Sequence, residues 1–347
     1  MIPPKLKNIR PPKSFDLHPS RFALEEKSFV QFDPYDTERP FLLVATPTIQ
    51  GIELTKWLSN HLDHISTLLL KHGAILFRNF NIQSVSKFKT VISAVTPDLI
   101  EYYEASTPRK LIGDKIYTST NYPPSETIFL HNEMSYTNDW PMKIWFFCEK
   151  PADSGGHTPI ADCRAVYRSL KPEVKAKFDT SSVMYTRTCG GPLGRTWQSI
   201  YGTDDKTAVE HYCRDNDIRW EWISSDTLHT KQVRQATASH PQTKDIVWFN
   251  QAHAYHNSTL KPSIRNHLTH SLKNGHFPRD AYYGDGSQID DETIAHILDA
   301  YEMHAIYFDW QAGDLLLLDN MLIAHGRTAF SGERHVLTAM AQPYRDT

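Results

Sequence analysis

The chain has 347 residues, of which 40% are hydrophobic and 22% charged, and its net charge at pH 7 is −3. This composition is typical of a folded globular protein, and the length allows one large domain or two modest ones. The absence of a strong basic excess argues against a nucleic-acid partner. No run of eighteen apolar residues occurs and no apolar leader follows Met1. We therefore expect neither a membrane-spanning nor a secreted protein.

Four cysteines occur at wide spacing: Cys148, Cys163, Cys189 and Cys213. None forms a CxxC pair, which argues against a zinc ribbon, and the spacing does not suggest a disulfide framework. We expect reduced thiols, mostly in the core, in a cytoplasmic protein. The sequence leaves the oligomeric state open, including a homo-oligomer.

The N-terminal third predicts alternating strands and helices. Residues 1–40 are rich in proline and charge and are expected to be extended. Residues 41–45 and 74–77 form short apolar runs that predict strands. Residues 52–71 carry leucines at helical spacing and predict an amphipathic helix, and residues 84–95 predict another.

From Ile116 onward, short apolar runs are broken by Gly, Pro, Asn and Asp, a pattern typical of a sandwich or barrel. Residues 165–235 interrupt it with helical and loop patterns. Strand-like runs then resume at residues 245–249, 314–318 and 336–340. The pattern predicts a mainly β fold in a single domain over 41–347, with flanking helices and an inserted segment at about 165–235.

The first motif with chemical meaning is His131-Asn-Glu133. Side chains two apart on a strand point to the same face, so this imidazole and this carboxylate can bind one metal ion together. His325, at the end of an apolar run, is the candidate third ligand. Two histidines and one carboxylate form the facial triad of non-haem Fe(II) oxygenases. The triplet alone occurs by chance in many proteins. Whether it is a metal site must therefore be judged from the sequence around it.

Those surroundings carry a resemblance to a known family. Four segments appear in the family's order: residues 74–80, 131–133, 155–162 and 325–334. Over about residues 40–343 the chain resembles the taurine dioxygenase/clavaminate synthase superfamily of 2-oxoglutarate-dependent oxygenases. It looks closest to a subgroup similar to the syringomycin-pathway aspartyl hydroxylase, on residues 248–251 and 283–286.

The resemblance implies a double-stranded β-helix, the jelly-roll or cupin-like fold. It also implies that His131, Glu133 and His325 are catalytic iron ligands. Thr158 and Arg334 match the residues that contact the distal carboxylate of 2-oxoglutarate. An arginine suits this role because its fork offers two parallel donors to a carboxylate. The implied cofactors are Fe(II), 2-oxoglutarate and O2.

The implied reaction converts 2-oxoglutarate and O2 into succinate and CO2 while the substrate is oxidised. Hydroxylation is the default outcome, and desaturation, epoxidation and cyclisation use the same ligands. A zinc hydrolase can also use two histidines and a glutamate, but no H-E-x-x-H helix occurs. A related halogenase would lack the carboxylate ligand that Glu133 supplies. A non-catalytic jelly-roll binding protein is a further alternative.

The sequence indicates the residues of the substrate pocket less clearly than those of the metal site. Family members that act on small free acids often carry a second arginine four residues after the first, where this chain has Thr338. This difference favours an amino-acid-type substrate from a specialised-metabolite pathway, either free or bound to a carrier protein. Another cation could take the missing role. The candidate substrate residues are Tyr136, Trp140, Asn250, Gln251, Arg195 and Arg327.

One further pair of histidines, His253 and His256, has HxxH spacing. If this segment is a strand, the two rings point to opposite faces. The sequence therefore predicts no second metal site there.

Overall fold

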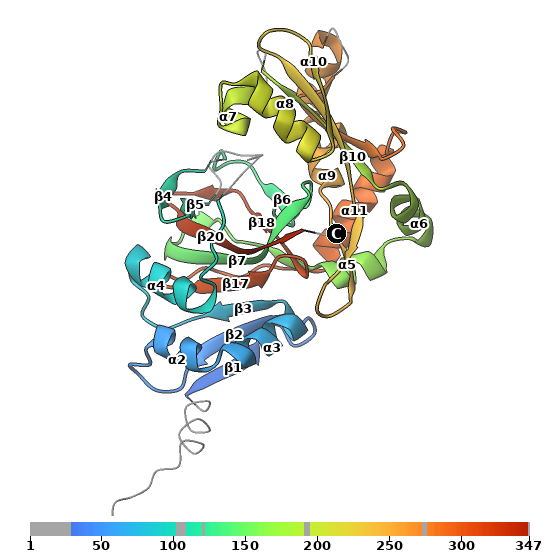
Figure 1. The fold of residues 1–347 in the computed structure, drawn as a ribbon. Helices are drawn as coiled ribbons and strands as arrows, with labels where there is room; N and C mark the ends of the chain where they lie inside the picture. The colour runs from blue at the N-terminus through green and yellow to red at the C-terminus, as the bar shows by residue number, and fades with distance from the viewer. Residues whose placement is uncertain (1–28, 102–108, 120–121, 191–194, 273–275, 346–347) are drawn as a thin grey trace, which may run out of the picture.

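The computed structural model describes residues 29–101, 109–119, 122–190, 195–272 and 276–345. Figure 1 shows three regions along the molecule: an N-terminal layer of helices and strands, a two-sheet barrel, and an insertion built around a separate sheet. The predicted mainly β fold with a jelly-roll core is confirmed.

The larger sheet of the barrel has eight strands in the order β1-β2-β3-β17-β7-β20-β5-β4. Antiparallel pairing dominates, and only β2 and β3 run parallel. The bounds of the strands are β1 Val30–Pro34, β2 Leu42–Pro47, β3 Ala74–Phe77, β4 Leu111–Gly113, β5 Ile116–Thr118, β7 Asp139–Lys150, β17 Leu315–Asp319 and β20 His335–Arg345.

The smaller sheet has four strands in the order β16-β9-β18-β6. Its strands are β6 Ile128–His131, β9 Ile160–Asp162, β16 Ala305–Ile306 and β18 Ile323–Arg327. Another short pair, β8 (Ser154–Gly155) and β19 (Phe330–Ser331), lies beside the barrel.

The leucine run in β17 shows why the large sheet is buried on both faces. Leu316 and Leu318 belong to the core between the two sheets, whereas Leu315 and Leu317 pack against the N-terminal helices. A strand covered on both sides has no need of alternating polar residues. This explains why the sequence of β17 is an unbroken apolar run, which is the feature that predicted the strand.

Three helices cover the outer face of the large sheet: α2 (Leu54–Asn60), α3 (Leu62–His72) and α4 (Val85–Val95). The single helix predicted over residues 52–71 is in fact two. The break is at His61, whose backbone leaves the helical region (φ −130°). Its ring stacks on Trp57 at 4.3 Å between centroids and Nδ1 bonds the Trp57 carbonyl, so a side-chain contact stabilises the break.

Within the segment predicted to be extended, residues 30–34 form β1 and pair with β2 in the large sheet. Residues 1–28 lie outside the described part of the chain.

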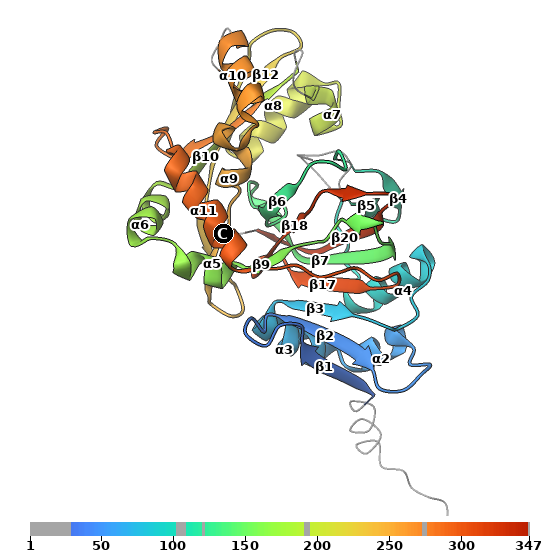
Figure 2. The same cartoon turned by 180° about the vertical axis from the view of Figure 1, so that it is seen from behind.

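The insertion runs from α5 (Cys163–Ser169) to α11 (Asp291–Met303), between β9 and β16. Its centre is an antiparallel sheet in the order β11-β12-β10-β15, formed by Ile218–Trp222, Leu228–Arg234, Val183–Cys189 and Arg279–Tyr283. The remaining elements are α6 Pro172–Ser181, α7 Trp197–Tyr201, α8 Lys206–Asp215, β13 Thr237–Ser239, β14 Ile246–Trp248, α9 Ala252–Tyr255, η1 Asn257–Thr259 and α10 Pro262–Ser271. Figure 2 shows this sheet and its helices on one side of the barrel.

The insertion is therefore longer than the segment predicted at about 165–235, and it contains a four-stranded sheet where helices and loops were expected. Its charged strands, such as β11 and β12, place polar residues on an exposed face and do not form apolar runs. The run at 245–249 was expected to belong to the barrel, but β14 pairs with β13 within the insertion.

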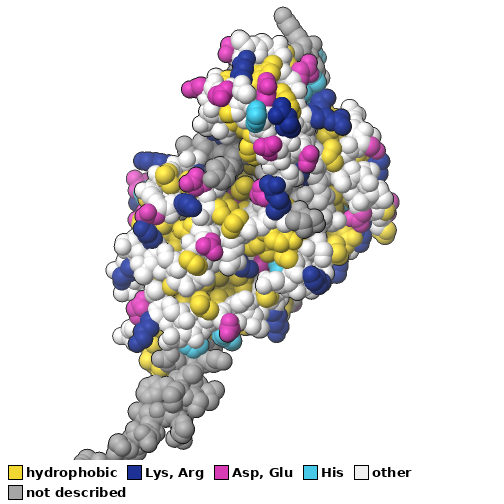
Figure 3. Space-filling view, viewed as in Figure 1, with side chains coloured by type: hydrophobic (Ala, Val, Ile, Leu, Met, Phe, Trp, Pro, Cys, Tyr) yellow, Lys and Arg dark blue, Asp and Glu magenta, His cyan; other side chains and the backbone are white. Residues whose placement is uncertain are grey.

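The four cysteines are buried and form no disulfide, as predicted. In the described part of the chain, no helix combines the length and apolar character needed to cross a bilayer. Figure 3 shows basic and acidic side chains interspersed over one face of the molecule.

Candidate metal centre

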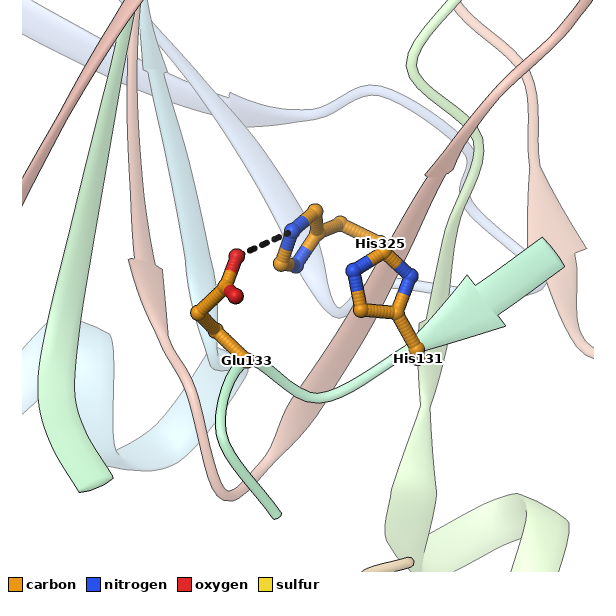
Figure 4. Close-up of side chains that lie close together, drawn as sticks. All are labelled: His131, Glu133 and His325. Atoms are coloured by element: carbon orange, nitrogen blue, oxygen red, sulfur yellow. Dashed lines mark ion pairs between the residues drawn. The ribbon is translucent and has the colours of Figure 1, made fainter. Parts of the chain in front are cut away.

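The register of two barrel strands brings His131 and His325 together. His131 is the last residue of β6, His325 is central in β18, and the two are direct partners in the antiparallel pairing. Their ring centroids are 4.6 Å apart. Although 194 positions separate them in the sequence, a single strand pair places both rings at one point (Figure 4).

Gly326 makes this close pairing feasible. The register of β18 against β6 shifts just after His325. A Cβ at Gly326 would lie 2.7 Å from the carbonyl oxygen of Ile128 on β6. A larger residue would push the two strands apart, so a glycine is required next to the histidine.

Glu133 is the third member of the group of possible metal ligands, and it lies after the end of the strand. β6 ends at His131, and the chain turns at Met134, which has φ 58°. The turn, and not strand alternation, directs the carboxylate toward the histidines. Glu133 Oε2 lies 3.9 Å from His325 Nε2, and one ligand atom from each of the three side chains lies within 4.8 Å of the others. Among the described residues, no other such group of three is found.

Asn320, at the end of β17, holds the turn that carries Glu133. Its side-chain oxygen accepts the Glu133 backbone N–H at 2.8 Å, and its amide donates to the Glu133 carbonyl at 2.9 Å. Asn132 in turn donates to the Asn320 carbonyl at 2.6 Å. Both asparagines are fully buried, so these bonds do not compete with water.

The segment before α9 supports the same turn from the opposite side. Gln251 donates to the Asn132 carbonyl at 2.8 Å, and His253 Nε2 bonds the Leu130 carbonyl at 2.7 Å. Asn250 donates to the Ala236 carbonyl and accepts the N–H of Ala252. Asn250 and Gln251 were expected in the substrate pocket. Their side chains instead bond backbone groups beneath the site.

The HxxH segment is helical, so the alternation of faces along a strand does not apply to it. His253 lies in α9 and His256 follows its end. Both histidines bond groups of the chain, His253 as above and His256 through the Ser258 hydroxyl.

The protonation states of the two site histidines suit metal binding. Burial lowers the pKa of the His131 ring, and it lowers the pKa of His325 well below the usual range. Both rings are therefore neutral at pH 7. The Nδ1 of His131 bonds the Phe129 carbonyl at 2.8 Å, which leaves Nε2 with the lone pair that a metal needs. A half-buried and a buried imidazole, both neutral, beside a buried carboxylate fit one divalent iron with its remaining positions open.

Arg109 is a site residue that the sequence analysis missed. Its guanidinium is 4% exposed and pairs with the Glu133 carboxylate at 2.5 Å. It precedes β4, far from every motif, so no sequence pattern marks it. Its charge is balanced by Glu133 in this structure, and it also lines the cavity next to the histidines.

Arg334 and Thr158 lie together in that small cavity, about 30 Å³, which both site histidines also line. Arg334 donates to the Thr158 hydroxyl at 3.3 Å, to Ser119 at 3.2 Å and to the Gly156 carbonyl at 2.8 Å. In the part of the chain that the structure describes, no carboxylate pairs with Arg334. Burial lowers its pKa to about 10. A desolvated cation of this kind requires an anionic partner.

Trp310 makes Thr158 a donor toward that anion. Its indole N–H donates to the Thr158 oxygen at 3.0 Å, and Arg334 donates to the same oxygen. A hydroxyl has two acceptor positions and one proton. With both acceptor positions used, the proton is left to bond a carboxylate. Trp310 was not identified from the sequence.

The other predicted substrate residues are dispersed. Trp140 is 1% exposed and packs against Phe249 and Tyr344 in the core, which places it outside the pocket. Tyr136 follows the Glu133 turn and is fully buried next to Tyr255.

The two candidate arginines are also engaged elsewhere. Arg327 donates to the carbonyls of Tyr122, Pro123 and Glu126, so it holds a loop while also lining the cavity. Arg195 lies beside α7 and donates to the Ser199 carbonyl.

Comparisons with known proteins agree with this geometry. The family of taurine catabolism dioxygenase TauD, TfdA matches residues 37–340. The dapdiamide synthesis protein DdaC of Enterobacter agglomerans is 37% identical over 89% of this chain and 94% of its own. A clavaminate synthase-like protein of Arabidopsis thaliana is 28% identical over 93% of this chain and all of its own.

Among solved structures, PvcB, an Fe, alpha-ketoglutarate dependent oxygenase from an isonitrile synthetic pathway, shares the fold. Its TM-score is 0.54 at 12% identity, over 91% of this chain and 94% of PvcB. The chain belongs to the taurine catabolism dioxygenase TauD, TfdA family, and it is a dioxygenase of that family.

Proposed function

We propose that this dioxygenase oxidises an unactivated C–H bond of an amino-acid-type substrate in a specialised-metabolite pathway, with hydroxylation as the default outcome and release of succinate and CO2. The observation that carries the proposal is the juxtaposition of His131, Glu133 and His325 with the carboxylate-binding pair Arg334 and Thr158 around one cavity. A metal triad beside a half-buried arginine that pairs with no carboxylate of the described residues suits a metal-chelating dicarboxylate.

In this proposal each residue has a defined task. His131, Glu133 and His325 hold iron, which together with 2-oxoglutarate and O2 supplies the oxidation. Arg334 and the Thr158 hydroxyl hold the distal carboxylate of 2-oxoglutarate. Asn320 fixes the direction of Glu133 through its two backbone bonds.

Apolar side chains pack against the triad and exclude water on that side. Phe146 packs edge-on against the His325 ring at 5.1 Å, and Val336 lines the same cavity. A dry site strengthens the interactions that orient the reactants and limits side reactions.

The substrate class rests on two observations. The relative at 37% identity is named for dapdiamide synthesis, which supports a role in specialised metabolism. Thr338, where small-acid enzymes often carry a second arginine, is fully buried and uncharged. The amino-acid-type substrate is therefore bound through other groups.

The test is O2-dependent formation of succinate from 2-oxoglutarate by the Fe(II)-loaded protein, screened with free amino acids and carrier-bound aminoacyl thioesters. We expect at least one of them to stimulate turnover and to be recovered with one added oxygen. Product mass separates hydroxylation and epoxidation from desaturation and cyclisation. Hydrolysis of a panel member without consumption of O2 would instead indicate a hydrolase, and the absence of any reaction would indicate a binding protein.

A further inference from the structure

Two arginines face each other across a strand pair of the insertion. Arg187 on β10 and Arg279 on β15 are direct partners in the antiparallel register. Like charges directly opposite each other in a sheet are destabilising. The fold therefore keeps this pair at a cost to its own stability, which is expected where the charges serve binding.

Both side chains lie on the face of the insertion sheet that turns toward the barrel. Side chains alternate along a strand, so Arg187 shares a face with Val183 and Tyr185, and Arg279 shares one with Ala281. Those three apolar residues are buried in the same core cluster as the barrel interior. The two guanidinium groups lie at the end of this row.

Two tyrosine rings connect the pair to the metal centre. Arg187 donates to the Tyr255 hydroxyl at 2.7 Å, and its guanidinium carbon lies 5.7 Å from the centroid of Tyr136. The guanidinium carbon of Arg279 lies 5.4 Å from the Tyr255 centroid. Tyr136 follows Glu133 by three residues, so the arginines approach the turn that carries the metal-binding carboxylate.

The charge of Arg279 is available to an added ligand. Its side chain is exposed, and none of the carboxylates in the described ranges forms an ion pair with it. It also lies near the centre, because its guanidinium carbon is close to the Tyr255 ring, whose centroid is 5.5 Å from that of Tyr136. Arg334, by comparison, lies in the barrel cavity on Thr158. The metal centre is thus flanked by two separate cationic groups.

We propose that Arg187 and Arg279 form an anion subsite that binds a free carboxylate of the organic substrate. This rests on the proposed oxygenase function and narrows it to substrates that keep a free carboxylate, such as an amino acid or an N-acylated amino acid. The subsite replaces the second barrel arginine that Thr338 precludes, and it does so from a different part of the fold. A substrate whose only carboxylate is masked as a thioester does not use it.

The test measures binding to the full chain loaded with Mn(II) and 2-oxoglutarate. The probes are the common L-amino acids and their N-acetyl derivatives, each as free acid and as methyl ester, titrated by calorimetry. We expect the tightest free acid to bind at least tenfold better than its ester. Arg279→Gln, and separately Arg187→Gln, should weaken the acid by about ten- to hundredfold, because a charge-assisted bond is lost. Either variant should leave the ester unchanged.

Arg219→Gln is the matched control, since Arg219 is an exposed arginine of the same sheet, on β11. We expect it to leave every titration unchanged. Equal affinities of acid and ester in the unmodified protein, equal loss of both in Arg279→Gln, or no acid that binds would each overturn the subsite. Failure of the proposed function is distinct, because it would appear as no O2-dependent succinate in the presence of any probe or carrier-bound thioester.

Discussion

The barrel and the insertion place their functional side chains by different means. In the barrel, strand register puts His131 opposite His325, and buried backbone bonds from Asn320 fix Glu133. In the insertion, Arg187 and Arg279 lie at the end of a sheet and reach the centre through tyrosine rings. Strand register pairs the two arginines as well, but their side chains are longer than an imidazole side chain, so register fixes the guanidinium groups less tightly than it fixes the histidine rings. The barrel is thus suited to chemistry that tolerates little displacement, and the insertion to recognition that can vary.

Several polar contacts join the two regions, among them those of Gln251 and His253 described above. Gln232 of β12 donates to the Tyr136 carbonyl at 2.8 Å, and Gln235 donates to the Ser135 carbonyl at 3.0 Å. Both bonds end on the turn that follows Glu133. With the bonds to the Leu130 and Asn132 carbonyls, the insertion therefore contacts the chain on both sides of Glu133.

The largest effect that we expect is in the barrel. Glu133→Ala removes the only carboxylate of the triad and should lower O2-dependent succinate formation by more than about a hundredfold, since even the loss of groups that support metal ligands costs 10- to 100-fold. Glu221→Ala, at an exposed position of β11, is the control and should retain activity. Near-normal turnover by Glu133→Ala would show that this carboxylate is not a ligand.

Next in size is the effect of Arg334→Ala on 2-oxoglutarate. Losing one partner of a buried charge pair costs about 2–5 kcal/mol, or roughly thirty- to a few thousandfold in affinity. Calorimetry on the Mn(II)-loaded protein should show this loss for 2-oxoglutarate and a smaller change for the organic substrate. An unchanged dissociation constant for 2-oxoglutarate would remove Arg334 from the site.

A smaller effect on Mn(II) affinity distinguishes the support that Glu133 receives from the barrel from the support that it receives from the insertion. Asn320→Ala frees the Glu133 turn and should weaken Mn(II) binding by about ten- to hundredfold. Gln232→Ala cuts a contact between the insertion and the barrel, and we expect less than about threefold loss of Mn(II) affinity because the Asn320 bonds remain. Equal losses in the two variants would contradict the division between barrel and insertion.

Much of the barrel could be predicted from the sequence because its signals are local. The leucine run of β17, the HxE triplet and the spacing of Arg334 from His325 each lie within a few residues. The fold class and the enzyme class were predicted correctly on this basis. The strand assignment of Glu133 was wrong, since β6 ends two residues earlier at a turn that depends on Asn320, which is distant in sequence.

The insertion could not be predicted in the same way. Its strands carry arginines, lysines and threonines, so they lack the apolar alternation that indicates a strand. Arg187 and Arg279 become partners only through the register of β10 and β15, and no local pattern links residues so far apart. Arg109 likewise gains its meaning only from contact with Glu133.

The smallest expected effect concerns pH and His253. Burial lowers the pKa of this histidine from 6.5 to about 4. Between those values the unfolded chain binds a proton that the folded protein does not, so stability is lost as the pH falls below 6.5. For one histidine the slope is at most about 1.4 kcal/mol per pH unit.

Urea unfolding of the metal-free protein at pH 7, 6 and 5 measures this slope. His253→Gln keeps a donor for the Leu130 carbonyl but does not titrate, so we expect a shallower dependence on pH. His211→Gln, at an exposed position of α8, should leave the dependence as it is. The same slope in His253→Gln and in the unmodified protein would show that His253 is not the source.

The most direct test of the account is the stoichiometry of metal binding to the barrel. Equilibrium dialysis with Mn(II) should give one ion per chain for the unmodified protein. His325→Ala should reduce binding to background, because it removes the ligand that strand register places opposite His131. His211→Ala, which removes an exposed histidine of α8 outside the triad, should retain one ion. Retention of one tightly bound ion by His325→Ala would contradict the proposed centre.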